Sequence, residues 1–313
     1  MLDWLSMEGC LTGAFVSRPW CGIQHHPAQR EIDSFERKIR KKLAVVMTFL
    51  AWGPPENLTP FPASWCSRVT QRGSLPMITW EPWDQKSECR DYRLEKILNG
   101  QWDFYLVQWA QAVRQWKNPL LVRWCHEMNG TWYPWDGVHN SSDPSLYIKA
   151  FRYMVQLFKH QKAINAYWVW APEVVLHLPH RGGIHDYTLY YPGDESVDWI
   201  GLDGYNFGTA PGRNDPWRSF DEIFGEAYHR MTQIAPKKPV VIAEFACGEK
   251  GGSKLLWIQE TFRSMQNYPN LKAWIWFNIQ KETDWPVDSS IGSLKAFQSA
   301  MNSPYFKERV PSG

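Results

Sequence analysis

The chain of 313 residues carries 34 Lys and Arg residues against 32 Asp and Glu residues, a formal net charge of +2 and a mean hydropathy of −0.46. Its length allows a sizeable buried core, and its near-neutral charge without a long basic run argues against a nucleic-acid partner. No window is apolar enough for a membrane span, and the start MLDWLSMEGC lacks a signal-peptide pattern, so we expect a soluble chain without a membrane partner.

Short apolar runs alternate with helical patterns along the whole chain, which is typical of a parallel sheet covered on both faces. The expected strands are Leu11–Val16, Ala44–Ala51, Leu75–Trp80, Leu120–Cys125, Ala166–Trp170, Trp199–Asp203, Val240–Glu244 and Ala273–Phe277. Eight such strands, with no Gly-rich dinucleotide fingerprint, favour a closed α/β barrel, the (β/α)8 TIM barrel, over an open doubly wound sheet. We expect one catalytic barrel domain over residues 1–313.

Helical patterns lie between these strands. The basic stretch Arg37–Lys42 is interpreted as the solvated C-terminal end of a helix, where cations favour the helix dipole. Gln101–Lys117 places apolar residues at three- and four-residue steps, and the next helix begins with Asp143 as N-cap and Pro144 in its first turn and runs to about His160. The remaining helices are expected near Asp221–Gln233, Ser253–Met265 and Ser289–Met301.

The six cysteines form no CxxC pair and no His/Cys spacing typical of a zinc site. Cys125 and Cys247 are interpreted as buried thiols, whereas Cys10–Cys21 and Cys66–Cys89 are candidate disulfides of a secreted protein. The HEMNG stretch lacks the second His, four residues on, that a zinc-protease helix supplies. We therefore expect no metal and no organic cofactor.

Polar residues cluster where the predicted strands end, and a barrel of this kind carries its chemistry on the loops that follow the strands. These residues are Glu81, His126, Glu127, Glu173, Asp203, Tyr205, Glu244 and Asn278. They are expected to converge on one mouth of the barrel.

Glu127 and Glu244 lie at the ends of strands three apart in the predicted barrel, so they can face each other across its mouth. Glycoside cleavage needs one carboxylic acid to protonate the leaving oxygen and one carboxylate to attack or to activate water. The aromatic surroundings of Glu127 favour a raised pKa, whereas an ionised Glu244 needs donors such as Tyr205 or Arg123. A structural ion pair that closes the barrel is the alternative interpretation of either glutamate.

The chain contains 20 tryptophans, more than a core of this size requires, and a tryptophan ring offers a flat platform for a sugar ring. Core packing is the alternative for each of them. Candidates for sugar contacts from their place near strand ends are Trp80, Glu81, Trp83, Trp135, Trp170 and Glu173, together with Asn129 of the HEMNG stretch.

Four stretches, in this order along the chain, resemble glycoside hydrolase family 26. They are RWCHEMNGTWYPW (Arg123–Trp135), YPGDESVDWIGLDGYN (Tyr191–Asn206), PVVIAEFACG (Pro239–Gly248) and WIWFN (Trp274–Asn278). The resemblance covers most of the chain after about residue 119, and no motif before it is matched.

The resemblance implies a retaining endo-glycanase with Glu127 as acid/base and Glu244 as nucleophile. It also implies that His126 and Trp132 line the cleft, that Tyr205 hydrogen-bonds the nucleophile, that Asp203 supports the pair from behind, and that Trp276 stacks under the reacting sugar. The family acts chiefly on β-1,4-mannan, mixed-linkage β-1,3-1,4-glucan and β-1,3-xylan. The WYPW segment looks closer to the glucan-cleaving members, so we expect a glucanase, with a mannanase and then a xylanase as alternatives.

Two further function classes are alternatives to a glycanase. A barrel that binds polysaccharide without cleaving it needs no glutamate pair, and an aldolase or phosphate-binding isomerase needs a strand-end lysine or a Gly-rich phosphate loop. Both are disfavoured, so we expect a polysaccharide or oligosaccharide as the partner and a monomeric enzyme. It would be secreted if a signal peptide has been removed and cytoplasmic otherwise.

Overall fold

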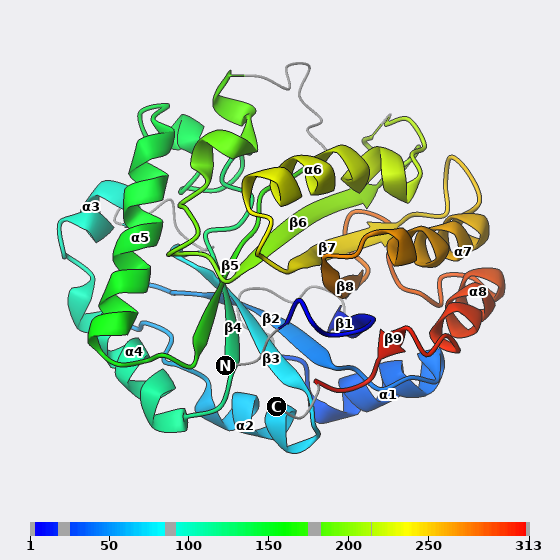
Figure 1. Cartoon of the computed structure of the whole chain (residues 1–313), viewed down its shortest axis with the longest axis horizontal. Helices are drawn as coiled ribbons and strands as arrows, with labels where there is room; N and C mark the ends of the chain where they lie inside the picture. The colour runs from blue at the N-terminus through cyan, green and yellow to red at the C-terminus, as the bar shows by residue number, and fades with distance from the viewer. Residues whose placement is uncertain (1–3, 18–25, 85–91, 175–182, 214, 311–313) are drawn as a thin grey trace.

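The structure is a computed structural model that describes residues 4–17, 26–84, 92–174, 183–213 and 215–310. Its centre is a barrel of parallel strands (Figure 1). These strands are β1 (Cys10–Val16), β2 (Val45–Ala51), β3 (Leu75–Glu81), β4 (Leu120–Trp124), β5 (Ala166–Trp170), β6 (Trp199–Asn206), β7 (Val240–Cys247) and β8 (Leu271–Asn278). Each strand pairs with its sequence neighbour, and β1 pairs with both β8 and β2, which closes the barrel. The predicted TIM-barrel class is therefore confirmed.

The strands form where the sequence predicts them because nearly every residue in them is buried on both faces of the sheet, as their unbroken apolar runs require. A short additional strand, β9 (Phe306–Lys307), pairs with the start of β1 and has no counterpart in the sequence prediction. Two residues are too few for a periodicity to reveal.

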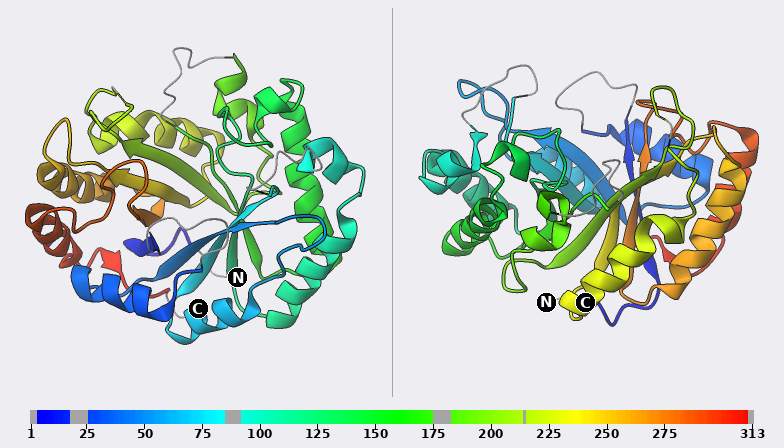
Figure 2. Two further views of the ribbon diagram at one scale, coloured as in Figure 1. Left: turned by 180° about the vertical axis from the view of Figure 1, so that it is seen from behind. Right: turned by 90° about the horizontal axis from the view of Figure 1, so that it is seen from above.

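Helices surround the barrel (Figures 1 and 2). They are α1 (Gln29–Ile39), α2 (Ala63–Gln71), α3 (Leu94–Leu98), α4 (Asp103–Trp116), α5 (Pro144–His160), α6 (Phe220–Ile234), α7 (Lys254–Ser264) and α8 (Ile291–Met301). The side chain of Asp143 caps α5 by accepting from the Ser145 N–H, as its position before Pro144 predicts. The basic stretch Arg37–Lys42 includes the last turn of α1, as expected.

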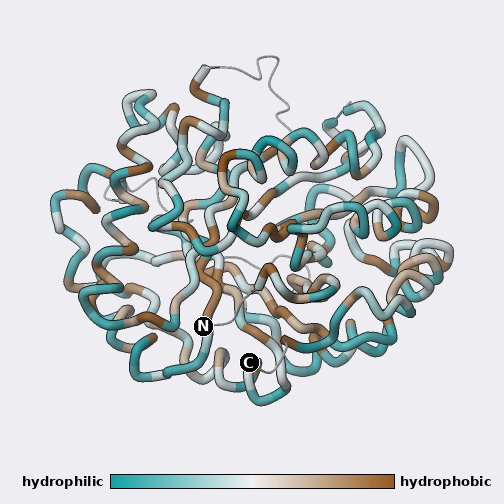
Figure 3. Tube along the Cα trace, in the orientation of Figure 1, coloured by the Kyte–Doolittle hydropathy of each residue, from teal (hydrophilic) through white to brown (hydrophobic). Residues whose placement is uncertain are grey.

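Short 3-10 helices fill several loops: η2 (Gly137–His139), η3 (Gly183–His185), η4 (Tyr187–Tyr190) and η5 (Met265–Asn267). Hydrophobic stretches concentrate in the strands and on the inward sides of the helices (Figure 3). Many aromatic side chains fill the layer between the barrel strands and the surrounding helices. Trp80 of β3, for example, stacks on Trp109 of α4 with ring centroids 4.0 Å apart.

Of the cysteines, Cys125 and Cys247 are buried thiols, as predicted. Cys21 and Cys89, one partner in each candidate disulfide, lie outside the described residues. Within the described ranges no helix combines the length and apolarity that crossing a bilayer demands.

Candidate active site

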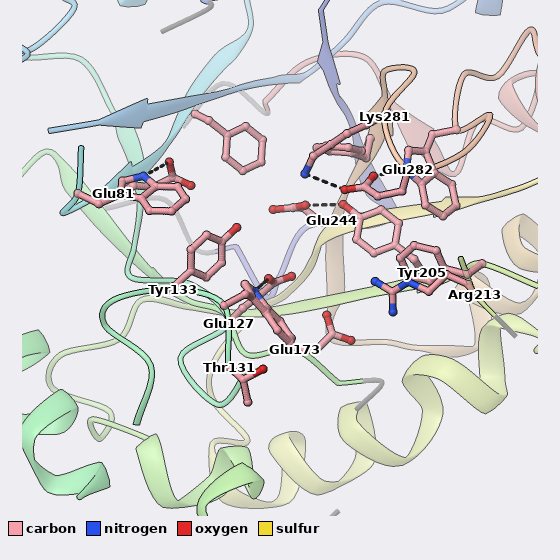
Figure 4. Close-up of a pocket in the computed structure, with 16 residues that line it drawn as sticks. Glu81, Glu127, Thr131, Tyr133, Glu173, Tyr205, Arg213, Glu244, Lys281 and Glu282 are labelled. Atoms are coloured by element: carbon pink, nitrogen blue, oxygen red, sulfur yellow. Dashed lines mark hydrogen bonds and ion pairs between the residues drawn. The ribbon is translucent and has the colours of Figure 1, made fainter. Parts of the chain in front are cut away.

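A cleft of about 700 Å³ lies at the carboxyl ends of the barrel strands (Figure 4). Its lining consists of Phe49, Glu81, Trp83, Glu127, Thr131, Trp132, Tyr133, Glu173, Tyr205, Phe207, Arg213, Glu244, Phe277, Lys281, Glu282 and Trp285. Glu127 and Glu244 point into this one space, with Glu81 on one side and Lys281 and Glu282 on the other (Figure 4). The structure thus brings the two predicted glutamates together.

Glu127 sits in a tight turn rather than at the end of a strand. β4 ends at Trp124, one residue earlier than predicted, and both Cys125 and Glu127 then adopt left-handed backbone conformations, with φ of 49° and 53°. Such conformations are costly for residues with a side chain and persist at sites that the surrounding structure holds in place. Here the Glu127 N–H donates to Ala171 O at 2.7 Å and its carbonyl accepts from Gly130 N–H at 2.8 Å.

The carboxyl group of Glu127 is nearly buried, and its Oε2 accepts a hydrogen bond from Trp132 Nε1–H at 2.8 Å. Burial, followed by the nearby charge of Glu244, raises the pKa of Glu127 to about 7, while the Arg123 cation and the Trp132 hydrogen bond oppose the rise. Glu127 is therefore protonated in a large fraction of molecules near neutral pH. This is the state that a general acid requires.

Glu244 reaches the cleft because β7 contains a β-bulge. Leu202 of β6 pairs with Ile242 and Asp203 pairs with Glu244, so Ala243 has no partner in the ladder. Bulges of this kind re-aim side chains next to active sites. Periodicity along the apolar run VVIAEFAC does not reveal the extra residue.

Arg123 is fully buried inside the barrel and binds the acidic residues beneath the cleft. Its Nε donates to Thr79 Oγ1 at 2.9 Å, its Nη1 donates to Asp203 Oδ2 at 2.6 Å, and its Nη2 donates to Glu244 Oε1. Burying a carboxyl group is costly unless it has a partner, and this cation gives hydrogen bonds to both Asp203 and Glu244. Burial nevertheless holds the pKa of Asp203 well above its usual value, against the lowering effect of the Arg123 cation. Arg123 and Asp203 therefore support Glu244 from below and do not line the cleft.

Tyr205 lines the cleft and donates its hydroxyl hydrogen to Glu244 Oε2. Burial and the charge of Glu244 hold the pKa of Tyr205 well above its usual value, so the hydroxyl keeps its proton and remains a donor. The two oxygens of Glu244 thus have different donors, Arg123 and Tyr205, the two that the sequence predicts.

His126 is 1% exposed and lies behind Tyr133 rather than in the cleft lining predicted for it. Its Nε2 is 3.1 Å from Tyr133 Oη, 3.9 Å from Glu244 Oε1 and 4.0 Å from Glu81 Oε1. Burial, aided by the Arg123 cation, holds the pKa of His126 well below its usual value. The ring is therefore neutral and forms no ion pair with either glutamate despite these distances.

Glu81 and Trp83 line the cleft, as their place after a strand predicts, and Glu81 lies on the opposite side from Tyr205 (Figure 4). Trp83 Nε1–H donates to Glu81 Oε2 at 3.0 Å. Burial raises the pKa of Glu81 to about 7, against the lowering effect of that hydrogen bond. The cleft therefore holds a second carboxyl group that titrates near neutral pH.

Several predicted sugar-binding residues are instead buried beneath the cleft or behind the barrel wall. Trp80 packs on Trp109, Trp170 packs against Tyr191, and Trp135 stacks beneath Tyr133 with ring centroids 4.4 Å apart. All three predicted tryptophans are fully buried and none lines the cleft.

Trp276 and Asn129 also differ from their predicted places. The Trp276 ring packs against Phe245 and Phe297, on the side of β8 that faces the helices, because alternate strand residues point to opposite faces. Its neighbour Phe277 lines the cleft instead. Asn129 Nδ2 donates to Glu173 O at 2.8 Å, so this side chain braces the loop after β5.

Other cleft residues were not singled out in the sequence: Phe49, Thr131, Tyr133, Phe207, Arg213, Phe277, Lys281, Glu282 and Trp285. The loop after β8 carries three of them in the charged stretch Lys281–Trp285, and the predicted strand-end residue Asn278 accepts the Val287 N–H at 2.9 Å to hold that loop. The charged composition of the stretch Lys281–Trp285 is the sequence signal that could have pointed to the cleft residues of this loop. Among the described residues, no group of three or more His, Cys, Asp or Glu side chains is arranged to hold a metal ion.

Comparison with curated proteins finds relatives named as an endoglucanase and as mannan endo-1,4-beta-mannosidases. Endoglucanase H of Acetivibrio thermocellus is 36% identical over 286 residues, which cover 90% of this chain and 30% of that protein. Mannan endo-1,4-beta-mannosidase A and B of Caldalkalibacillus mannanilyticus is 30% identical over 207 residues, which cover 64% of this chain and 35% of that protein. The chain thus spans about a third of the length of these relatives.

Solved structures share the fold at low sequence identity. A GH26 β-mannanase from Bacteroides ovatus superposes with a TM-score of 0.70 at 17% identity, covering 97% of this chain and 92% of that one. A Bacillus subtilis mannanase gives a TM-score of 0.66 at 18% identity, covering 97% and 89%. The model of the family described as "Glycosyl hydrolase family 26" matches residues 69–284, well over half of the chain and the whole span from Glu81 to Glu282 of the cleft. The chain therefore belongs to glycosyl hydrolase family 26.

Proposed function

We propose that this chain is a retaining endo-β-glycanase that uses Glu127 as acid/base and Glu244 as nucleophile. The observation that carries the proposal is the unequal setting of two glutamates in one cleft. Glu244 is held by an arginine cation and a tyrosine hydroxyl, whereas Glu127 is nearly buried with its pKa raised to about 7. Such a division of acid and base between two carboxyl groups is what glycoside cleavage requires.

In the first step, a Glu244 oxygen attacks the anomeric carbon of the bound sugar while Glu127 gives its proton to the glycosidic oxygen. The bond from the anomeric carbon to that oxygen breaks, the leaving sugar departs with a free hydroxyl as its new non-reducing end, and a covalent ester between the anomeric carbon and Glu244 remains. Arg123 and Tyr205 hold the attacking carboxylate in place, which limits the reorganisation needed to reach the transition state.

In the second step, Glu127 takes a proton from water as that water attacks the anomeric carbon and releases Glu244. The charge of Glu244 helps to raise the pKa of Glu127, and this charge is absent while the ester exists. The pKa of Glu127 then falls, which favours the ionised form that can act as a base. The same repulsion thus prepares Glu127 for each of its two roles.

For the substrate, we favour mixed-linkage β-1,3-1,4-glucan. The support is the extent of similarity: the match to an endoglucanase covers 90% of this chain at 36% identity, whereas the match to a mannosidase covers 64% at 30%. The WYPW segment, Trp132–Trp135, points the same way. β-1,4-Mannan is the alternative substrate, since several relatives are named as mannan endo-1,4-beta-mannosidases.

The experiment that tests the mechanism compares Glu244→Ala with Glu260→Ala, the same change at an exposed position on α7. Reducing-end release from mixed-linkage β-glucan and from β-mannan is measured side by side. We expect Glu244→Ala to lose at least about 1,000-fold in kcat and Glu260→Ala to match the unaltered chain. Full activity in Glu244→Ala would overturn the proposal, and activity on mannan alone would overturn only the substrate choice.

Glu127→Ala separates the acid role from a structural one. An activated aryl glycoside needs little protonation of its leaving group, whereas a natural polysaccharide needs much more. We expect a loss of about 100- to 10,000-fold on the polysaccharide and a much smaller loss in the first step on the aryl substrate. An equal loss on both substrates would contradict the acid role.

A further inference from the structure

A buried carboxyl group with no role in the mechanism above lies at the end of the HEMNG-containing loop. Asp136 is fully buried, and its Oδ2 accepts the backbone N–H groups of Trp132 at 2.7 Å and of Tyr133 at 2.9 Å. Its own N–H donates back to Tyr133 O at 3.1 Å. One carboxyl oxygen therefore fixes the backbone of two consecutive residues that line the cleft.

The side chains of those two residues contact the acid/base region directly. Trp132 Nε1–H donates to Glu127 Oε2 at 2.8 Å, and Tyr133 Oη lies 3.1 Å from His126 Nε2. Trp132 is 43% exposed, so packing alone leaves much of its indole unrestrained. The two backbone hydrogen bonds to Asp136 set the direction from which this indole approaches Glu127.

The other end of Asp136 is anchored as well. Its carbonyl accepts from Asn140 Nδ2 at 2.9 Å, and the adjacent Trp135 donates from Nε1 to His126 O at 2.7 Å. Trp135 also stacks on the ring of Tyr133. Asp136 is thus a fixed point from which the Trp132–Tyr133 backbone is held.

We propose that Asp136 is a positioning residue for the acid/base: it holds the Trp132 and Tyr133 amides so that the Trp132 indole keeps its hydrogen bond to Glu127. The inference rests on the proposed function of Glu127. It goes beyond that function because Asp136 acts on the reaction only through another side chain.

The expected consequence concerns the alkaline limb of the pH profile of kcat/KM. A hydrogen bond from Trp132 favours the ionised form of Glu127 and so lowers its pKa. Loss of that bond raises the pKa of Glu127, and the acid then stays protonated to higher pH. Besides Asp136, whose own pKa burial holds well above its usual value, the charged or titratable groups that act on Glu127 include Arg123, Tyr133, Glu173, Asp203, Tyr205, Glu244 and Lys281. All of them remain in the variants below.

The test measures kcat/KM against pH on mixed-linkage β-glucan, or on β-mannan if the unaltered chain cleaves only that. Asp136→Ala removes the acceptor, and Asp136→Asn keeps a carbonyl oxygen that can accept both N–H groups. Positioning predicts an alkaline limb about one pH unit higher in Asp136→Ala and near the original value in Asp136→Asn. If Asp136 acts instead through its charge, both variants move the limb to lower pH, because a negative group near Glu127 has been removed.

A second pair of variants asks whether the effect passes through Trp132. Trp132→Phe keeps an aromatic ring and removes the indole N–H. This single change should therefore move the alkaline limb of kcat/KM to higher pH. Adding Asp136→Ala to Trp132→Phe should then move the limb no further. A further shift of the same size in the double variant would overturn the proposal.

Stability is measured on each variant by thermal unfolding. A purely structural role predicts a lower Tm with an unmoved limb, which would also overturn the proposal. If Asp136→Ala does not fold, Asp136→Ser replaces it, since a single short hydroxyl cannot serve both amides. A limb in the unaltered chain that Glu127→Ala leaves unchanged would instead contradict the acid/base role of Glu127, so the two failures are distinguishable.

Discussion

At the proposed nucleophile, each oxygen of Glu244 has a different donor, and the two donors are open to separate tests. Arg123 is fully buried beneath the cleft, so its removal would leave buried carboxylates unpaired and endanger the fold. Tyr205 lines the cleft and touches Glu244 through one hydroxyl group only. Tyr205 is therefore the residue whose removal reports on the reaction rather than on folding.

We expect Tyr205→Phe to lower kcat by roughly 10- to 150-fold, which is what the loss of a hydrogen bond to a charged group is worth. The matched control is Tyr191→Phe, which removes a hydroxyl that donates to Asp194 at 2.7 Å outside the cleft. Steady-state kinetics with both variants decides the matter. Equal kcat values would show that Arg123 alone holds the carboxylate.

The sequence predicted the positions of the polar cleft residues better than it predicted which tryptophans line the cleft. Glu127, Glu244 and Tyr205 meet in the cleft as the sequence predicts, because charged and hydroxyl groups near the carboxyl ends of barrel strands or in the turns that follow them are costly to bury elsewhere. Trp80 and Trp276 do not, because a tryptophan is equally suited to a sugar platform and to the layer between barrel and helices. Only the face of the strand on which it lies separates the two uses.

At the scale of elements, a buried lysine ties α7 to the loop after β8. Lys254 is 1% exposed, and its Nζ donates to the carbonyls of Asp284 at 2.6 Å, Trp285 at 3.2 Å and Pro286 at 2.9 Å, and to Ser289 Oγ at 2.9 Å. Burial lowers the pKa of Lys254 to about 8. This loop carries one wall of the cleft, so the lysine joins a helix outside the barrel to the site.

Lys254→Met keeps the aliphatic length of the side chain and removes a charged donor from three carbonyls. Trp285 O keeps the Trp276 Nε1–H donor and Pro286 O keeps the Ser289 N–H. We expect the free energy of unfolding to fall by about 3 kcal/mol and KM for the glycan to rise, because the loop with Trp285 is released. Lys295→Met, at an exposed position on α8, is the control. Denaturant unfolding and kinetics on both variants check the prediction; an unchanged KM with lowered stability would show that the loop keeps its shape without the lysine.

The elements were predictable where they are regular. The strands and the helix after Asp143 appear close to their expected bounds because burial on two faces and a local cap both leave marks in the sequence. The turn at Cys125–Glu127 and the bulge at Ala243 leave no such mark. Both depend on hydrogen bonds to neighbouring strands, and both decide where the two glutamates point.

For the whole molecule, the raised pKa of Glu127 links the site to stability. The pKa is about 7 in the folded chain against 4.5 for an ordinary glutamate, so the folded state binds more protons between these values. Its contribution to stability is complete below pH 4.5 and is lost as the pH rises through about 7. Burial of the Glu127 carboxyl group therefore lowers the stability of the folded chain more at alkaline than at acidic pH.

The side chain at position 127 cannot ionise in the Glu127→Gln variant, so this variant does not lose stability through ionisation at this position as the pH rises. Relative to the unaltered chain, we expect its free energy of unfolding to gain up to about 3 kcal/mol between pH 4 and pH 8. Thermal or denaturant unfolding at several pH values measures the difference, with Glu260→Gln on the exposed face of α7 as control. A difference that stays constant with pH would contradict the raised pKa.

The sequence by itself determined the barrel class, the approximate strands and the family resemblance, and it indicated that Glu127, Glu244, Arg123 and Tyr205 lie near one another. These follow from local signals: apolar runs, caps, and polar residues placed after strands. Tertiary structure alone decided which carboxyl group is buried, which tryptophans face the cleft, and that Asp136 and Lys254 hold its loops. The reason is physical: exposure, pKa and hydrogen-bond geometry depend on neighbours that lie far away along the chain.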